Sequence, residues 1–305
     1  MNAIETSQLT RRFGRTSAVV DLNLTVPAGS VYALLGPNGA GKTTTLKLLL
    51  NLLRPTHGTA RVLGLESTKL GATDFQRIGY VTEEQTLPAW MTLAQLIAFC
   101  RPLYPTWDDA LAARLLTVFD LPADRPLKKM SRGMRMKAAL LSTLAYRPEL
   151  LLLDEPFSGL DPLSRDDFVQ GLLELPGEDR PRTVLISTHD IDDIERLADH
   201  VGFLASSKLL LSEPADTLRA RFRQIEITGE IPPAFGPPAT WLAWQQPTPR
   251  VAQFTHTAFV PGETEAALAA QFPGAGIQTR PLTLRQIFLV LARDQRLARK
   301  TEAAA

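Results

Sequence analysis

The chain has 305 residues, of which 45% are hydrophobic, and its formal net charge at pH 7 is +1. This hydrophobic content can bury a core, and the length allows one large domain or two smaller ones. The small net charge gives no general indication of nucleic-acid binding. The single cysteine, Cys100, excludes disulfides and multi-cysteine metal sites within one chain.

No stretch has the pattern of a targeting or membrane-spanning segment. Residues 1–14 lack the apolar core of a signal peptide, and no apolar run reaches the ~18 residues of a membrane span. We therefore expect a soluble, cytoplasmic chain, which leaves open a partner embedded in the membrane.

Residues 1–35 are predicted to form strands and turns. Val19–Val26 alternates in part between apolar and polar residues, and Ser30–Leu35 is a short apolar strand. Thr43–Leu53 then carries the apolar stripe of a helix. The first clear strand and the first clear helix therefore lie on either side of one short loop.

This loop, Gly36–Thr44, reads GPNGAGKTT and fits the pattern G-x-x-x-x-G-K-[ST]. Its glycines let the backbone curl, so that successive N–H groups face one anion at the positive end of a helix. Lys42 would add a charge at the β- and γ-phosphates, and Thr43 would offer its hydroxyl to Mg²⁺. The pattern predicts a nucleotide-binding loop; the alternative is a chance glycine-rich turn.

The middle of the chain changes from short strands to helices. Strands are predicted at Thr59–Leu63 and Ile78–Thr82, and the pattern is mostly helical from about Glu83 to Tyr146. The predicted helices are Thr92–Tyr104, Asp108–Phe119 and Ser131–Tyr146. We interpret this region as a helical insertion between two parts of a sheet domain.

Two carboxylates follow the most apolar strand of the sequence. Leu150–Leu153 suits a buried parallel strand, and Asp154 and Glu155 then lie at its carboxyl end, where ligands bind. Asp154 can hold Mg²⁺ and Glu155 can polarise an attacking water as a general base, unless both are turn or capping residues. Asp161 and Pro162 suit the N-cap and first position of another helix.

The last third of the chain differs in composition from the rest. Thr183–Ser187 and Val201–Ala205 are predicted strands, and Ile191–Asp199 between them is a predicted helix. The composition changes after about Pro214, and Ile231–Thr240 is too rich in proline for regular structure.

Residues 216–305 are interpreted as a small accessory domain. Arg223–Thr228 and Val251–Ala258 are strand candidates. Thr283–Arg299 is a predicted helix whose Thr283 and Gln286 have the spacing of a capping box.

Taken in order, these motifs resemble the ATPase subunits of ATP-binding-cassette (ABC) transporters, of the single-cassette type that pairs with separate permease chains. Met130–Met134 (MSRGM) stands where the family has its LSGGQ-type signature, and Ser158–Asp161 (SGLD) stands at the D-loop. His189, in STHD, is at the switch position, and Phe13 is where the family places an aromatic that stacks on adenine. The resemblance covers about residues 5–215.

The resemblance implies an α/β fold, a P-loop NTPase of the ABC ATPase type. Such a fold has a mostly parallel sheet core, an antiparallel β subdomain and a helical subdomain. It places the nucleotide-binding domain at residues 1–215, with a helical insert at about 84–147. Residues 216–305 then form a small α+β C-terminal accessory domain.

The resemblance also implies a role for each motif residue. Thr43 and Asp154 would bind Mg²⁺, Glu155 would activate water, and His189 would contact the γ-phosphate, with Lys42 completing the catalytic set. ATP would be held by Gly36, Asn38, Gly39, Ala40, Gly41, Lys42, Thr43 and Thr44, with Phe13 at the adenine.

Three further residues would act across a dimer interface. Ser131 and Gly133 would contact the γ-phosphate of ATP bound to a second subunit, and Asp161 would lie beside them. From position alone, Ser131 and Asp161 also suit N-caps. His189 also suits a structural role, and Phe13 a place in the core.

Three positions depart from the family pattern, and one of them is Met134, which replaces a glutamine in the signature. The family has a glutamine after the strand that Ile78–Thr82 represents, where this chain has Glu83. We expect Glu83 to take that role toward Mg²⁺, with Gln85 as the alternative. In the signature, Arg132 replaces a glycine, and it either approaches the phosphates or faces solvent.

The function implied by the resemblance is that of the ATP-hydrolysing, energy-coupling subunit of an ABC transporter, expected to be an exporter. Its cofactors would be ATP and Mg²⁺. Its partners would be an integral-membrane permease and a second ATPase subunit, identical or related, with no nucleic acid. It would be cytoplasmic and peripheral on the inner face of the cell membrane.

Exposed Trp90 and Met91 would contact the permease, unless they form the core of the helical lobe. One alternative function is a soluble ABC-type ATPase that acts on nucleic acid or ribosomes. The other is a P-loop kinase, which would not explain the SRGM and SGLD segments.

Overall fold

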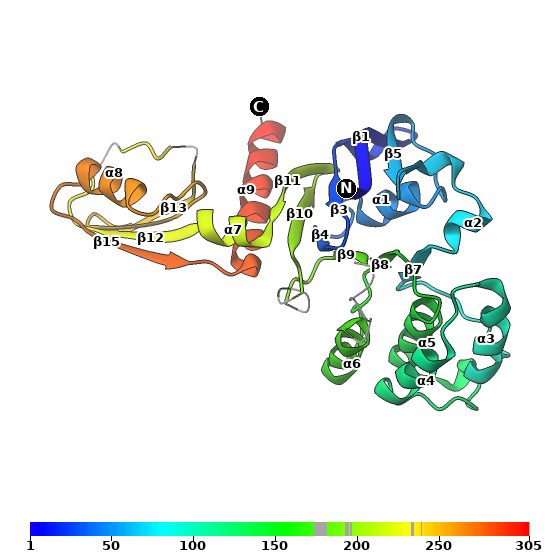
Figure 1. The fold of residues 1–305 in the computed structure, drawn as a ribbon. Coiled ribbons are helices and arrows are strands. Elements are labelled where there is room, and N and C mark those ends of the chain that lie inside the picture. The colour runs from blue at the N-terminus through cyan, green and yellow to red at the C-terminus, as the bar shows by residue number, and fades with distance from the viewer. Residues whose placement is uncertain (174–181, 193–194, 196, 233–234, 239, 305) are drawn as a thin grey trace. The chain divides into compact units, whose positions relative to one another are not determined.

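The computed structural model describes residues 1–173, 182–192, 195, 197–232, 235–238 and 240–304, with side chains described up to residue 294. The chain divides into two compact units, Met1–Ser212 and Glu213–Ala305 (Figure 1). The first unit contains two sheets and the second unit one, and each unit has its own buried apolar cluster.

The first unit begins with an antiparallel sheet in the order β2-β1-β5-β6, with β3 also paired to β1. Its strands are β1 (Asn2–Phe13), β2 (Thr16–Leu22), β3 (Thr25–Pro27), β5 (His57–Val62) and β6 (Leu65–Glu66). Leu22, Leu24 and Val26 are fully buried beneath it. The single strand predicted over Val19–Val26 is in fact two strands, because the extended pairing stops at Asn23 and Leu24, between the end of β2 and the start of β3.

The second sheet of this unit has the order β11-β10-β4-β9-β8-β7, and the five strands from β10 to β7 are parallel. The strands are β4 (Val31–Leu35), β7 (Ile78–Thr82), β8 (Leu150–Asp154), β9 (Thr183–Thr188), β10 (His200–Ala205) and β11 (Lys208–Pro214). Every residue of β8 and β9 is buried, as their continuous apolar runs predicted.

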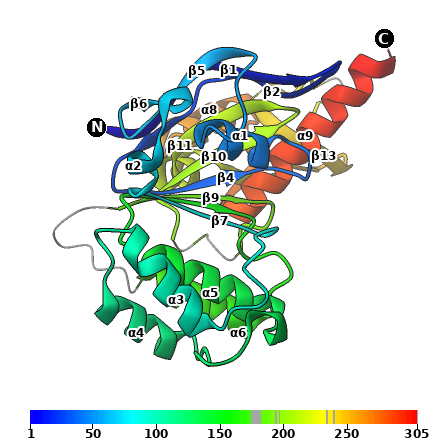
Figure 2. The ribbon, with the colours of Figure 1, turned by 90° about the vertical axis from the view of Figure 1, so that its right-hand side faces the viewer.

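Helix α1 (Lys42–Leu49) packs between the two sheets (Figure 2). Its Leu46, Leu48 and Leu49 are buried in one cluster with leucines of β2, β4 and β8. The helix ends four residues earlier than predicted, since Asn51 takes a left-handed φ of 56°. The short α2 (Ala72–Phe75) leads into β7.

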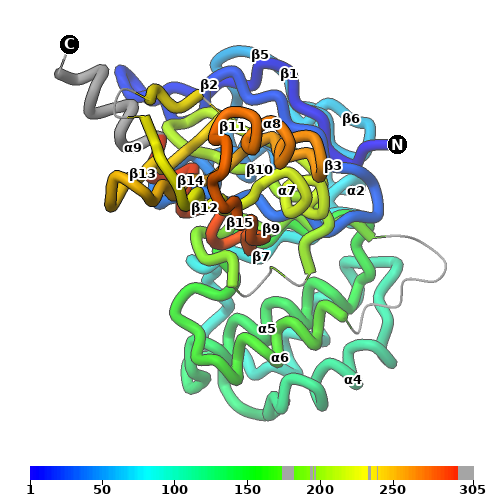
Figure 3. The backbone as a smooth tube through the Cα atoms, turned by 90° about the vertical axis from the view of Figure 1, so that its left-hand side faces the viewer, coloured from blue at the N-terminus to red at the C-terminus, as the bar shows by residue number. Residues whose placement is uncertain are grey.

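A layer of helices lies on the far side of the parallel sheet from β1 and β5 (Figure 2). It contains α3 (Leu93–Cys100), α4 (Asp109–Val118), α5 (Arg132–Leu144) and α6 (Pro162–Leu173). The first three come between β7 and β8 in the chain, and α5 and α6 run side by side (Figure 3). The Asp108 side chain caps α4, and α3 gives way to a 3₁₀ turn over Arg101–Leu103, which contains Pro102.

The second unit has a four-stranded antiparallel sheet in the order β13-β14-β12-β15. Helix α8 covers one face, where Leu268 and Phe272 are buried with Trp241 and Phe254. The unit comprises α7 (Ala215–Arg221), β12 (Arg223–Thr228), β13 (Trp241–Thr248), β14 (Val251–His256), α8 (Glu263–Gln271), β15 (Gly276–Pro281) and α9 (Leu284–Ala304). The capping box at the start of α9 is confirmed, because Thr283 and Gln286 exchange hydrogen bonds.

The sequence patterns identified most elements but not all of them. Strands β11, β13 and β15 and helices α7 and α8 were not predicted. The helix predicted over Ile191–Asp199 falls in part on 193–194 and 196, which lie outside the described residues, and its other residues are in turns or irregular backbone. In the part of the chain that the structure describes, no helix is long and apolar enough to cross a membrane.

The buried strand β8 gives a stability prediction. Leu152 is fully buried between α1 and the neighbouring strands, whereas Leu52 is exposed just beyond α1. Leu152→Ala should lower the free energy of unfolding by about 2–5 kcal/mol, because it removes apolar contacts and leaves a cavity. Urea denaturation would measure this, with Leu52→Ala as the control that stays within about 0.5 kcal/mol of wild type. Equal losses in the two variants would contradict the burial of β8.

Candidate functional site

The predicted site residues converge at the carboxyl edge of the parallel sheet. Strands β4, β9 and β8 are neighbours there, with Leu35 level with Thr188, and Asp154 level with Ser187. Because parallel strands end at the same edge, the loop after β4 and the acids after β8 face one region. Residues more than a hundred positions apart in the chain thus form one site.

The loop between β4 and α1 depends on glycine at two points. Gly41 has a φ of 105°, and a Cβ there would lie 2.2 Å from the carbonyl oxygen of Ala18. A Cβ on Gly36 would lie 2.3 Å from the carbonyl oxygen of Leu204. The helix then begins at Lys42, so the N–H groups of its first turn have no intrahelical acceptor and can bind an anion. Among the remaining predicted residues, Asn38, Gly39 and Ala40 lie in the loop, and Thr43 and Thr44 lie in the first turn of α1.

Lys42 is a buried cation, with 5% of its side chain exposed. Its Nζ donates to the carbonyl oxygen of Gly36 at 2.8 Å and lies 2.9 Å from Oε1 of Glu155. A buried ammonium group requires compensation of this kind, because desolvation of an unpaired charge is costly. A phosphate oxygen offers the same compensation, so the geometry suits exchange of Lys42 from Glu155 to a nucleotide phosphate.

Asp154 is buried and accepts two hydroxyl hydrogen bonds on one oxygen. Thr43 donates to its Oδ1 at 3.1 Å and Ser187 at 2.5 Å. Burial raises the pKa of Asp154, against the hydrogen bonds from Ser187 and Thr43, which lower it. A bound cation would favour the ionised form of this carboxylate.

The residues around Asp154 fit Mg²⁺ held together with a nucleotide. The Thr43 hydroxyl and the Asp154 carboxylate are in direct contact, so both oxygens can face one ion. Among the described residues, no three His, Cys, Asp or Glu side chains form a metal-binding group. Mg²⁺ does not need one, since it commonly takes one or two protein ligands plus phosphate and water oxygens.

Glu155 and His189 form a second polar pair beside the loop. Nδ1 of His189 lies 2.8 Å from Oε2 of Glu155, whose other oxygen faces Lys42. A cavity of about 90 Å³ is lined by Glu155, His189 and Gly159, among other residues. This volume admits a water molecule next to a carboxylate that can accept its proton.

Ser131 and Asp161 each cap a helix. The Ser131 hydroxyl accepts from the N–H of Met134 at 3.1 Å, at the start of α5. Asp161 accepts from the N–H of Ser164 at 3.0 Å, and this hydrogen bond lowers the pKa of Asp161. The capping alternatives are therefore confirmed, while contacts of Ser131, Gly133 and Asp161 with a second subunit's nucleotide stay a prediction.

The remaining expectations have mixed outcomes. Phe13 is exposed at the end of β1 with the guanidinium of Arg11 over its ring, so the core alternative is wrong and adenine stacking stays a prediction. Trp90 is 74% exposed, as expected of a contact residue, but Met91 is only 7% exposed. The expectation that Met91 is exposed was wrong because its backbone pairs with the 126–127 segment and its side chain joins the lobe.

Glu83 lies directly after β7 but its carboxylate contacts the signature segment. It accepts from Arg132 and, at 2.9 Å, from the Ser158 hydroxyl. The Arg132 side chain is exposed, as the solvent-facing alternative expected, but it also forms an ion pair with Glu83, which was not expected. The Mg²⁺ role of Glu83 stays a prediction. The amide oxygen of Gln85 is buried and has no hydrogen-bond partner among the described residues.

One residue of the site was missed by the sequence reasoning. Ser187 donates to the same carboxylate oxygen as Thr43, and it sits in the apolar strand β9. The only signal was a hydroxyl near the end of that strand, and its use depends on β9 lying next to β8.

The greater part of the chain is similar to known proteins. Residues 19–158 match the family model described as ABC transporter. The chain is 38% identical to the daunorubicin/doxorubicin resistance ATP-binding protein DrrA of Streptomyces peucetius, over 72% of this chain and 67% of that protein. It is 31% identical to the ABC transporter ATP-binding protein YtrB of Bacillus subtilis, over 73% and 76%.

A solved structure of an ATP-binding subunit of an ABC transporter has the same fold. It superposes with a TM-score of 0.64 and 26% sequence identity, over 71% of this chain and 92% of that one. The ABC-type P-loop fold expected from the motifs is therefore confirmed for the greater part of the chain.

The buried Lys42 gives a binding prediction. Lys42→Ala should weaken binding of a nucleoside triphosphate about 10- to 100-fold, because charge-assisted hydrogen bonds to phosphate are lost. Isothermal titration would measure this. Lys47→Ala, which removes a lysine from the same helix, serves as the control and should bind as wild type does. Unchanged affinity in Lys42→Ala would contradict the role of the loop.

Proposed function

Because the chain belongs to the ABC transporter ATP-binding proteins, which couple ATP hydrolysis to transport, we propose that it powers an exporter through a separate permease chain, as one half of a dimer that closes on ATP. The observation that carries the proposal is the site at the sheet edge, where Lys42, Asp154 and Glu155 lie in contact with one another or with the loop. Membership in this family argues against the kinase alternative.

The first step is the binding of ATP by the loop before α1. The N–H groups of the first turn and the Lys42 ammonium bind the phosphates, and Lys42 gives up its contact with Glu155. Thr43 and Asp154 would hold Mg²⁺, which would neutralise charge on the phosphates. Phe13, exposed at the end of β1, stacks on the adenine.

Glu155 is the general base of the hydrolytic step. Once Lys42 has moved to the phosphates, the Glu155 carboxylate is free to accept a proton from water. The water oxygen bonds to the γ-phosphorus while the bond to the β–γ bridging oxygen breaks, which releases ADP and phosphate. His189, 2.8 Å from Glu155, orients this carboxylate and contacts the γ-phosphate.

A second subunit supplies the helix end that the site lacks. Strand order places β7 three strands away from β4, which is roughly 14 Å at the usual strand spacing. The start of α5 is tied to Glu83 at the β7 end, so Ser131 and Gly133 lie away from their own Lys42. They fit instead the γ-phosphate on a facing copy or a related ATPase subunit, with Asp161 at the interface. Cleavage of that phosphate then opens the dimer.

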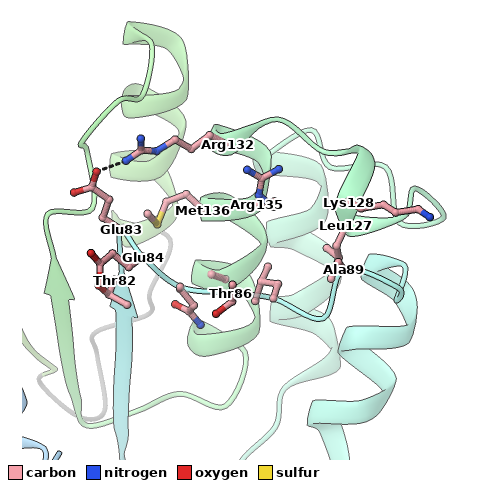
Figure 4. A pocket seen from close by; sticks show the side chains of 13 residues that line it. Thr82, Glu83, Glu84, Thr86, Ala89, Leu127, Lys128, Arg132, Arg135 and Met136 are labelled. Carbon is pink, nitrogen blue, oxygen red and sulfur yellow. Dashed lines mark hydrogen bonds and ion pairs between the residues drawn. The ribbon is translucent and has the colours of Figure 1, made fainter.

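The permease contacts the helical layer. A pocket of about 460 Å³ is lined by the segment after β7 and by the first half of α5 (Figure 4). The exposed Trp90 lies just beyond this segment in the chain. A large exposed aromatic beside a groove is typical of a protein interface. The chain would thereby be held peripherally on the inner face of the cell membrane, although none of its described helices crosses it.

The name of one relative supports the proposed export, while two other relatives are named for sulfate/thiosulfate import. The relative from Streptomyces peucetius is named for resistance to daunorubicin and doxorubicin, an outcome expected of a protein that removes drugs from cells. The substrate itself would be selected by the membrane-embedded partner. Residues 216–305 would act as an accessory domain on the nucleotide-binding domain at 1–215.

The base assignment can be tested with Glu155→Gln. This change keeps the size of the side chain and removes its basicity, so ATP hydrolysis should slow by about 10²- to 10⁴-fold while ATP still binds. The variant should accumulate as an ATP-bound dimer, measured by size-exclusion chromatography with light scattering. Glu149→Gln, which changes the residue just before β8, is the matched control. Full ATPase activity of Glu155→Gln would exclude Glu155 as the base.

The permease contact can be tested with Trp90→Ala. Tagged wild type, purified from detergent-solubilised membranes of its own host, should retain one integral membrane protein that stimulates its ATPase activity. Trp90→Ala should retain at least about tenfold less of it, because buried tryptophans dominate many interfaces. Leu52→Ala, another exposed apolar residue of the same unit, is the control. Equal retention by Trp90→Ala would contradict this docking surface.

A further inference from the structure

Three segments of the first unit meet at the carboxylate of Glu83. Arg132, at the start of α5, donates to its Oε1, and Ser158, in the turn before α6, donates to the same oxygen at 2.9 Å. Figure 4 shows the Arg132–Glu83 contact at one end of the pocket between the segment after β7 and α5. One carboxylate oxygen therefore connects the loop after β7, the signature helix and the 158–159 turn.

Arg132 is also packed against the backbone of that turn. A Cβ on Gly159 would lie 2.9 Å from Nη1 and 3.0 Å from Cζ of Arg132, and Gly159 has a φ of 66°. The guanidinium thus lies over the glycine while its other nitrogen reaches Glu83. This double contact fixes the orientation of the Arg132 side chain more closely than an ion pair alone would.

The starts of α5 and α6 are held together just beyond this point. A Cβ on Gly133 would lie 2.8 Å from Oγ of Ser164, so the two helices approach closely there. One turn further on, the buried Nζ of Lys137 donates to Asp167 at 2.8 Å. The starts of α5 and α6 are therefore packed into one body, and within these two helices Arg132 is the residue that contacts Glu83.

Glu83 connects this body to the sheet edge. Its N–H donates to the carbonyl oxygen of Asp154 at 3.1 Å, and the preceding Thr82 is level with Asp154 in the β7–β8 pairing. Asp154 and Glu155 are the acids of the nucleotide site. The path from Asp154 through Glu83 to Arg132 contains one backbone hydrogen bond and one ion pair.

We propose that Glu83 and Arg132 are positioning residues for ATP hydrolysis. Their ion pair holds the start of α5, which presents Ser131 and Gly133 to the facing subunit, in register with Asp154 and Glu155 of its own subunit. The inference rests on the proposed closed dimer, in which each subunit must present both surfaces correctly. It assigns Glu83 a partner within the protein in place of Mg²⁺.

The pair is exposed enough for its contribution to depend on salt. The side chains of Arg132 and Glu83 are 46% and 36% exposed, and such pairs are screened at high ionic strength. We expect its loss to change the turnover number rather than the affinity for ATP, because the phosphate loop itself is not touched. The size of the change should be about fivefold, the upper range for exposed ion pairs.

A double-mutant cycle in the full chain tests this assignment. Glu83→Ala and Arg132→Ala should each lower kcat for ATP about fivefold at low salt, with KM within about twofold of wild type. The double variant should be no slower than the slower of the two single variants, because both changes remove the same ion pair. In high salt, wild type should approach the variants. Additive losses, or an Arg132→Ala variant with wild-type kcat, would overturn the proposal; the second result would return Glu83 to a role at Mg²⁺.

A matched control pair lies at the other end of β7. Arg77 and Glu149 form an ion pair with 44% and 37% exposed side chains, close to the values for Arg132 and Glu83. It joins the start of β7 to the residue before β8, away from the nucleotide site. Arg77→Ala should leave kcat within about twofold of wild type. A fivefold loss in this control would show that any exposed pair has the same effect, and would overturn the assignment.

Hydrogen exchange gives a readout that does not require activity. Glu83→Ala should increase amide exchange at residues 131–135, and Arg132→Ala should increase it at residues 83–86, since each segment loses its tie to the other. Arg77→Ala should change neither. Changes confined to the mutated segment would overturn the proposal. A wild-type chain that does not hydrolyse ATP would instead contradict the proposed function, and the exchange experiment would still decide on the ion pair.

Discussion

The structure depends on a buried cation at the edge of the parallel sheet. Lys42 is held by a backbone carbonyl of its own loop and by Glu155 from a strand two places away in the sheet. Glu155 is more than a hundred positions from Lys42 in sequence, so the ion pair exists only when β4, β9 and β8 are assembled. A phosphate can replace Glu155 as the partner of Lys42. The assembled sheet therefore positions the cation that would bind the nucleotide.

The exchange of Lys42 from Glu155 to a phosphate also explains why Glu155 suits a general base and the neighbouring Asp154 does not. Asp154 is buried, and both Thr43 and Ser187 donate to one of its oxygens, so it is fixed in place and suits a metal ligand. Glu155 is paired to Lys42 on one oxygen and to His189 on the other. If Lys42 moves from Glu155 to a phosphate, its charge no longer neutralises the Glu155 carboxylate. The carboxylate can then accept a proton from water.

The features that could be predicted from the sequence are those that depend on a local residue pattern. The glycine-rich loop and β8 were found because the loop needs glycine and a doubly covered strand needs an unbroken apolar run. The second unit was predicted less completely, since β13 and β15 have exposed, polar residues that mask their alternation. The use of Ser187 could not be predicted, because it depends on which strands are neighbours, and strand order is a long-range property that periodicity does not encode.

Glu83 and Arg132 show the same limit at the site itself. Taken one at a time, each departs from the pattern of the resembled family, and sequence reasoning placed Glu83 at the metal and left Arg132 between phosphate and solvent. In the structure the two opposite charges meet, 49 positions apart in the chain, and Gly159 is the residue that lets the guanidinium pass. An acidic residue in the one segment and a basic residue in the other satisfy each other. When two residues of opposite charge both differ from the family pattern, an ion pair between them should therefore be considered before either is assigned to a bound ligand.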